Sequence, residues 1–289
     1  MADAPAYVVH ELLRRIDDGR WGELADLYAE DTFVEHPLRG THVDGRAVLG
    51  ERFLRLGTFR MRVSEVVVHE TTDPELVVAE YRTRGPGYSA ANLQVVRVRD
   101  GLITHSRDYH DHLRMAAARG DFDGLVVAYQ SAESDVSEGV HEPLVAAPLD
   151  SPRAVVWRLL DGISAKDPAA RADLYTSDAF VTYPFHPTAP ALKGRDELRQ
   201  HFARGGGAGL RPRNVVFHDG ADPELVIVEF EYAGTVGPGN PVVARNVFVT
   251  RVRDGLIVES RDYGDHVAYA AATGRLPDLL ADARSVVSC

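Results

Sequence analysis

The chain has 289 residues, of which 45% are hydrophobic, and a formal net charge of −11. This length and composition predict two domains with packed cores, and the acidic balance argues against a nucleic-acid-binding protein, which usually presents a basic face. The only cysteine is Cys289, so an intrachain disulfide, a cysteine metal site and a buried catalytic thiol are excluded.

The N-terminal residues carry neither the basic end nor the long apolar stretch of a signal peptide. No apolar run approaches the roughly 18 residues that a membrane-spanning helix needs. We therefore expect a cytoplasmic protein that does not contact membranes.

The chain is expected to open with an amphipathic helix, because apolar residues recur at helical spacing at Val8, Val9, Leu12, Leu13 and Ile16. A second short helix is expected at residues 24–28, followed by the apolar segment FVEHP at 33–37 and by a third helix that begins near Gly45. Four strand-forming runs follow, at residues 63–69, 76–81, 93–98 and 102–109. The dipeptide Asp100-Gly101 predicts a two-residue hairpin turn between the last two runs. Three helices followed by an antiparallel sheet make an α+β unit.

The second half of the chain repeats the first. The segment RVRDGLITHSRDYHDH at residues 97–112 returns as RVRDGLIVESRDYGDH at 251–266, with thirteen of sixteen positions identical. Upstream, DPELVVAE at 73–80 returns as DPELVIVE at 222–229. The order is kept, and a unit of this size has its own core, so the repeat indicates a duplicated domain rather than a solenoid.

These repeats place the domain boundaries. We expect a first domain at residues 1–129, a linker rich in Ser, Glu, Ala and Pro at 130–150, and a second domain at 151–289. The first helix of the second domain is expected to begin with Ser151 as its N-cap and Pro152 as its first residue.

The order of elements, the FxxHP segment and the terminal strand VRDGLIxxSRDYxDH together resemble the SnoaL-like proteins of the nuclear-transport-factor-like, ketosteroid-isomerase-like superfamily. The RDYxD ending is most similar to the phenazine-biosynthesis PhzA/PhzB-type and polyketide-cyclase branches. The resemblance implies two tandem cone-shaped α+β barrels, each a curved antiparallel sheet around its first helix with a pocket inside. Because such proteins commonly pair through their sheets, it also implies a monomer built as an intrachain pseudo-dimer, with linked independent cones and a further homodimer as alternatives.

Asp108 and Asp262 are the first candidates for catalysis, since both lie in the repeated SRDY. The resemblance implies that this position holds an acid or base, and a carboxylate on an apolar pocket wall exchanges protons near neutral pH. The alternative is a structural ion pair with the adjacent Arg107 or Arg261.

Four further side chains are candidates. His36 could exchange a proton with Asp108, and its counterpart Tyr183 could donate a hydrogen bond to a developing oxyanion. Asn92 and Asn246 recur at the start of a strand and are candidates for binding a substrate oxygen. The alternatives are a packed aromatic ring for His36 and Tyr183, and a turn residue for the two asparagines.

His105, Arg107 and Tyr109 flank Asp108 and are predicted to contact the substrate. His105 and His110 do not predict a metal site, because residues an odd number apart point to opposite faces of an unbroken strand and because the second copy has Glu259 and Gly264 instead. No phosphate-binding loop is present either, so neither a metal nor another cofactor is expected.

The resemblance and these residues predict a cofactor-independent acid–base enzyme of secondary metabolism. It would act as an isomerase, cyclase or dehydratase on a small apolar molecule with a carbonyl group. The alternatives are an epoxide hydrolase or epoxide-opening cyclase, suggested by the adjacent Arg107 and Asp108, and a non-catalytic small-molecule-binding protein. Because His36 could pair with Asp108, the first domain is expected to be the active one.

Overall fold

The computed structural model describes residues 4–57, 60–130, 147–165, 167–204, 209–237 and 239–286. The chain divides into two compact units, residues 1–132 with 283–289 and residues 133–282, called the first and second unit below. Most of the expected linker, as well as Cys289, lies outside the described residues. Within the described residues no helix is long and apolar enough to cross a membrane.

The first unit contains a six-stranded sheet with the order β2-β1-β6-β5-β4-β3. Strands β1 and β6 are parallel, and the other neighbours are antiparallel. The strands are β1 (Tyr28–His36), β2 (Thr41–Asp44), β3 (Arg62–Glu70), β4 (Leu76–Gly85), β5 (Tyr88–Arg99) and β6 (Leu102–His110). The helices are α1 (Pro5–Asp17), α2 (Arg46–Leu56), α3 (His112–Arg119) and α4 (Phe122–Gln130).

The second unit repeats this topology, with the sheet order β8-β7-β12-β11-β10-β9. Its strands are β7 (Tyr175–Thr182), β8 (Leu192–Lys193), β9 (Leu210–Asp219), β10 (Leu225–Val236), β11 (Asn240–Arg253) and β12 (Leu256–Gly264). Its helices are α5 (Pro152–Ser164), α6 (Pro168–Ala172), α7 (Gly194–Arg204) and α8 (His266–Ala272), with α9 (Leu276–Ser285) up to residue 282. Two tandem α+β domains, the predicted fold class, are therefore confirmed.

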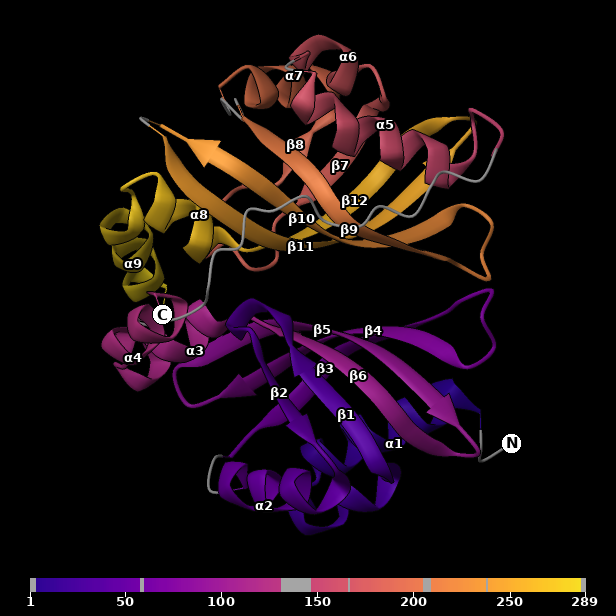
Figure 1. Cartoon of the computed structure of the whole chain (residues 1–289), viewed down its shortest axis with the longest axis vertical. Helices are drawn as coiled ribbons and strands as arrows, with labels where there is room; N and C mark the ends of the chain where they lie inside the picture. The colour runs from indigo at the N-terminus through magenta and orange to yellow at the C-terminus, as the bar shows by residue number, and fades with distance from the viewer. Residues whose placement is uncertain are drawn as a thin grey trace. The chain divides into compact units, whose positions relative to one another are not determined.

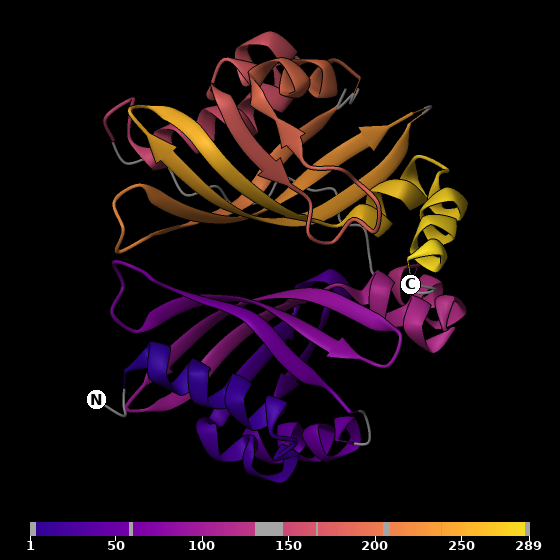
Figure 2. The same ribbon diagram turned by 180° about the vertical axis from the view of Figure 1, so that it is seen from behind.

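In each unit the first helix packs on one face of the curved sheet, called the inner face below (Figures 1 and 2). Val9 and Leu12 of α1 are buried in one core with Val77 and Ala79 of β4 and Val96 of β5. In the second unit α5 packs in the same way on β10 and β11. Removing such apolar side chains from water stabilises each unit by about 1.5–3 kcal/mol per residue.

Two local predictions are confirmed and one is wrong. Asp100-Gly101 turns between β5 and β6 with positive φ at both residues, and the Ser151 side chain caps α5 by accepting from the backbone N–H of Ala154. The short helix expected at residues 24–28 is instead a pair of 3₁₀ helices, and Tyr28 already begins β1. Its ring is buried against the core, so tertiary packing overrides the local helical spacing there.

An irregularity in β6 decides which side chains reach the inner face. The pairing of β5 with β6 shifts register between Arg97/Val98 and His105/Ile103, so Thr104 is an extra residue. Such a bulge reverses the alternation along the strand. Ile103 lies in the core before it, and Ser106, Asp108 and His110 are the inward-facing residues after it.

The second-last residue of the repeated motif is structural in both copies. The side chains of Asp111 and Asp265 accept hydrogen bonds from the backbone N–H groups of Arg114 and Ala268, at 2.9 and 3.0 Å. Each aspartate is therefore the N-cap of the helix that follows the last strand of its unit.

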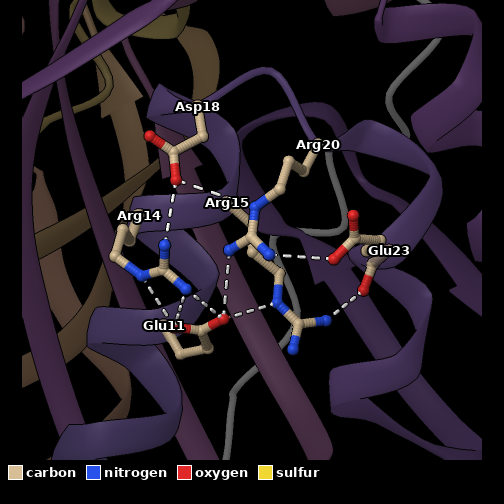
Figure 3. A network of polar contacts seen from close by, with 6 residues as sticks. All are labelled: Glu11, Arg14, Arg15, Asp18, Arg20 and Glu23. Carbon is tan, nitrogen blue, oxygen red and sulfur yellow. Dashed lines mark hydrogen bonds and ion pairs between the residues drawn. The ribbon is translucent and has the colours of Figure 1, made fainter.

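A network of ion pairs fastens the end of α1 to the turn that follows (Figure 3). The Glu11 carboxylate accepts from Arg15 at 2.7 Å, from Arg14 at 2.8 Å and from Arg20 at 3.2 Å. The hydrogen bonds of Arg15 and Arg14, that of Arg15 above all, lower the pKa of Glu11 to about 2. The contacts of Arg14 and Arg15 with Glu11 are (i, i+3) and (i, i+4) pairs on the helix surface, whereas Arg20 reaches Glu11 from the turn after the helix.

Candidate functional site

Asp108 faces the inner side of the first sheet. It pairs with Gln94 of β5, which is two residues from the core residue Val96 on the same face. Asp108 is only 7% exposed. The Ser106 hydroxyl, two residues earlier and on the same face, donates a hydrogen bond to Asp108 Oδ1.

His36 lies beside Asp108. It ends β1, the strand next to β6, and is 6% exposed. Neither ring nitrogen has a hydrogen-bond partner among the described residues. Burial lowers the pKa of His36 to about 4, against the opposing influence of Asp108, so the ring is neutral at pH 7.

His110 is held by a chain of hydrogen bonds. Its Nδ1 lies 2.8 Å from Oδ1 of Asn92, the residue opposite it on β5. Asn92 in turn donates from Nδ2 to Thr83 Oγ1 and to the Ala90 carbonyl, both at 3.1 Å. Because the Asn92 oxygen only accepts, Nδ1 of His110 carries the proton and Nε2 keeps its lone pair.

Arg52 and two tyrosine rings also belong to this surrounding. The pKa of Arg52 on α2 is lowered by burial and held up by Asp108. The pKa values of Tyr28 and Tyr81 are raised well above their usual value by burial, with Asp108 as the next cause. The inner face around Asp108 is therefore a buried polar cluster that includes two neutral phenols and one arginine.

The second unit places Asp262 in the corresponding position, opposite Phe248. Ser260 again donates a hydrogen bond to Oδ1 of the aspartate. Burial raises the pKa of the Asp262 carboxyl to about 7, although the Ser260 hydrogen bond and the charge of Arg171 lower it. Asp108 and Asp262 alternate with Arg107 and Arg261 along their strands and so lie on the opposite face, which argues against an ion pair between these adjacent residues.

Phenols and aromatic rings surround Asp262. The pKa values of Tyr175, Tyr183 and Tyr232 are all raised by burial, with Asp262 as a further cause, so each is a neutral hydrogen-bond donor at pH 7. The Tyr183 hydroxyl lies 3.4 Å from His201 Nε2. Phe230 packs edge-on against both Tyr232 and Phe248, with ring centroids 4.8 and 4.9 Å apart.

Arginine occupies different positions in the two units. Arg171 of α6 stands where the first unit has the buried core residue Leu24. Its guanidinium carbon lies 4.1 Å from the centre of the Phe202 ring, a cation–π contact. Arg52 of the first unit corresponds to His201 of the second.

Of the nine predicted site residues, the structure brings three together in each unit. They are Asp108, His36 and Asn92 in the first unit, and Asp262, Tyr183 and Asn246 in the second. Asn246 faces inward, opposite Gly264. Asn246 donates from Nδ2 to the Ala244 carbonyl at 2.7 Å. Neither asparagine is a turn residue, since both lie within a strand.

His105, Arg107 and Tyr109 need a correction, because they alternate with Ser106 and Asp108 and face the other side of the sheet. There His105 Nε2 lies 2.6 Å from Glu35 Oε1. They cannot share a substrate with Asp108, and the adjacent Arg107 and Asp108 do not form a site for epoxide opening.

Sequence reasoning missed Ser106 and Ser260, although their signal was present: a residue two positions before an inward aspartate on the same strand shares its face. Also missed were two arginines and four tyrosines: Arg52, Arg171, Tyr28, Tyr81, Tyr175 and Tyr232. They come from helices and strands distant in the sequence, and only the fold brings them to the aspartates.

The model of the SnoaL-like domain family matches this chain twice, at residues 9–106 and 156–260. A solved structure from Bacillus subtilis, assigned as an isomerase, is 20% identical and covers 43% of this chain and 93% of its own, with a TM-score of 0.40. A phenazine biosynthesis-related protein from Pseudomonas aeruginosa is 18% identical over 43% of this chain and 84% of its own, with a TM-score of 0.37. An NTF-2 like protein of unknown function from Burkholderia xenovorans is 20% identical over 36% of this chain and 80% of its own, with a TM-score of 0.32. No curated protein matches the chain significantly in sequence.

Proposed function

The chain belongs to the family of SnoaL-like domains, whose model covers more than half of it, and on this premise we propose that its second unit catalyses proton transfer on a small, largely apolar molecule with a carbonyl group. The reaction is of the isomerase, cyclase or dehydratase kind and uses no cofactor in that unit. We also propose that it belongs to secondary metabolism and takes place in the cytoplasm.

One observation carries the proposal: the Asp262 carboxyl faces the inner side of its sheet with a pKa of about 7. A general acid or base works best when its pKa lies near the working pH, because both protonation states are then populated. The pKa of Asp111 is also raised to about 7, but that carboxylate caps α3 and lies 3.1 Å from Nε of Arg114. Asp262 has no such structural task.

The neighbours of Asp262 suit an enolate mechanism. Ionised Asp262 takes a proton from the carbon beside the carbonyl group, and the electron pair of that C–H bond moves toward the carbonyl oxygen. A neutral Tyr183 hydroxyl donates a hydrogen bond to this oxygen as its negative charge grows. Protonated Asp262 then returns the proton to a different carbon, which completes an isomerisation. The Phe230 and Phe248 rings offer the apolar contact that a largely hydrocarbon substrate needs.

The properties of His36 make the first unit the weaker candidate for catalysis. The expectation of an active first unit rested on a proton exchange between His36 and Asp108. Burial lowers the pKa of His36 to about 4, and its ring nitrogens form no hydrogen bond with Asp108. A base of that pKa is weaker at pH 7 than a carboxyl group that titrates there.

The test follows the migration of a double bond. A β,γ-unsaturated cyclohexenone is converted to its conjugated isomer in the presence of the protein, and the new absorbance is recorded. We expect Asp262→Asn to lower the rate by about 10²- to 10⁴-fold, since a positioned acid or base contributes that much. Tyr183→Phe is expected to lower it by about 10²-fold, the usual cost of one oxyanion donor.

The matched control is Asp108→Asn, the same change at the same position of the first unit, which is expected to keep the wild-type rate. An equal loss in Asp108→Asn and Asp262→Asn would contradict the assignment to the second unit. A wild-type protein that binds the ketone but isomerises it no faster than Asp262→Asn would support a binding protein instead.

A further inference from the structure

We propose that His36, Asp108 and His110 of the first unit form a binding site for a divalent transition-metal ion. The three residues come from two neighbouring strands, β1 and β6. One ligand atom of each, two imidazole nitrogens and a carboxylate oxygen, lies within 4.8 Å of the others. This inference does not rest on the proposed function of the second unit.

The unpaired ring of His36 is the second observation. A buried polar atom without a partner is unfavourable, and each such atom in a folded protein calls for an explanation. Both ring nitrogens of His36 are in this position within the described part of the chain, and the residue is only 6% exposed. A metal ion bound by one of them would remove the deficit at that nitrogen.

His110 is already oriented as a metal ligand. In metal sites the ring nitrogen that does not bind the metal usually donates to a fixed acceptor, which sets the tautomer and the ring plane. Here Nδ1 of His110 donates to Asn92 Oδ1 at 2.8 Å, and Asn92 is fixed by Thr83 and Ala90. Nε2 of His110 is therefore the nitrogen left for a metal.

The charges around the three residues are mixed. Arg39 and Arg52 bring positive charge that opposes a cation, and the Asp108 carboxylate offsets part of it. The two phenols of Tyr28 and Tyr81 are neutral.

The spacing requires only side-chain movement. Ligand atoms about 2.0–2.2 Å from a metal lie about 3.4 Å from one another, so the three side chains would close by about 1 Å. Two imidazoles and a carboxylate suit zinc, iron and cobalt in the divalent state. Three protein ligands leave a coordination position for water or for an oxygen atom of a small molecule.

The second unit lacks this site, because Tyr183 and Gly264 stand in the positions of His36 and His110. His105 and His110 lie on opposite faces of the sheet, as strand alternation predicts, and form no site together. The histidine that lies near His110 is His36, which comes from the adjacent parallel strand and was not considered as a ligand from the sequence.

The experiment measures metal binding directly. Untagged full-length protein is freed of metal with a chelator and titrated with Zn²⁺ in a calorimeter, and Co²⁺ is added separately to record its visible spectrum. We expect one ion per chain. His36→Tyr and His110→Gly, which install the residues of the second unit, are expected to weaken binding by at least about 100-fold, and Asn92→Ala by about 10- to 100-fold.

The matched control is His105→Glu, which also installs the residue of the second unit but on the other face of β6, and it is expected to bind as the wild type does. Circular dichroism checks that each variant folds. If the two histidine variants do not fold, Asp108→Asn and the zinc X-ray absorption spectrum of the wild type decide, with two imidazole ligands expected.

Fewer than two imidazole ligands, or undiminished binding in folded His36→Tyr, His110→Gly or Asp108→Asn, overturns the proposal. The same holds for a wild-type protein that binds no Zn²⁺. Because the readout is binding by the first unit, these outcomes are independent of whether Asp262→Asn lowers turnover in the second.

Discussion

His110 Nδ1 and Asn92 Oδ1 lie 2.8 Å apart across the antiparallel pair of β5 and β6. In the second unit the same pair of positions holds Gly264 and Asn246. With no side chain opposite, Asn246 donates, within the residues that the structure describes, to the Ala244 carbonyl alone. The two units thus have the same strand pairing and the same asparagine, but only the first unit has a histidine ring that this asparagine orients.

This difference predicts unequal effects of the same substitution. Asn92→Ala leaves the buried Nδ1–H of His110 without an acceptor and is expected to lower the free energy of unfolding by about 1–3 kcal/mol. Asn246→Ala, the matched change, leaves no side-chain donor without its acceptor and is expected to lower the free energy of unfolding by about 1 kcal/mol. Urea titrations measure both. Equal losses would show that the His110 hydrogen bond contributes nothing.

The raised pKa of Asp262 predicts a pH-dependent stability. In the folded protein this pKa is about 7, whereas it is about 3.9 in an unfolded chain. Between these values the folded state holds a proton that the unfolded state has lost, so stability falls as pH rises from about 4 to 7. Asp262→Asn is expected to reduce this slope, of which Asp111, with its pKa also raised to about 7, supplies a further part. The variant is also expected to gain stability relative to the wild type at pH 8, by on the order of a few kcal/mol.

Urea unfolding at pH 5 and pH 8 checks this, with Asp108→Asn measured in parallel. A wild-type slope between pH 5 and 8 that remains unchanged in Asp262→Asn would contradict the raised pKa.

His266 predicts the opposite trend in acid. Burial lowers its pKa to about 3 in the folded protein, below the value of about 6.5 in an unfolded chain. The unfolded state therefore takes up a proton first, and stability falls as pH drops below about 6.5. His266→Phe is expected to reduce this acid sensitivity in thermal unfolding between pH 7 and 4.5. His10→Phe, a change on the exposed surface, is the control, and an equal effect of both would refute the explanation.

Arg171 predicts a shift in the titration of Asp262. Its charge lowers the pKa of that carboxyl, and the first unit has Leu24 in its place. Arg171→Leu is therefore expected to raise the pKa of Asp262 above about 7. Carboxyl ¹³C NMR follows the titration, and Arg199→Leu, which removes an arginine paired with Asp173 and Asp196, is the control. A fall in the pKa on Arg171→Leu would contradict the electrostatic account.

Much of the fold follows from local patterns in the sequence. The repeated motif and the Asp100-Gly101 turn place the last two strands of each unit, and the SnoaL-like resemblance predicts the curved sheet and its helices. The prediction for Tyr28 was wrong: this residue was expected in a helix but begins β1. Its ring is buried in the core, and such tertiary packing is invisible to helical spacing.

The candidate site was only partly predictable for a similar reason. The aspartates could be found because they recur in SRDY, and strand alternation separates Asp108 from Arg107. The parallel pairing of β1 with β6 brings His36 beside Asp108 across about seventy residues of sequence, which no local pattern encodes. The raised pKa of Asp262 depends on burial, which only the folded chain creates.

The titration of the Asp262 carboxyl carbon in the wild-type protein, followed by ¹³C NMR with Asp262→Asn to assign the signal, tests the central claim most directly. Proton transfer by the second unit requires a midpoint near pH 7. A midpoint near pH 4, the value of an ordinary solvated aspartate, would contradict it.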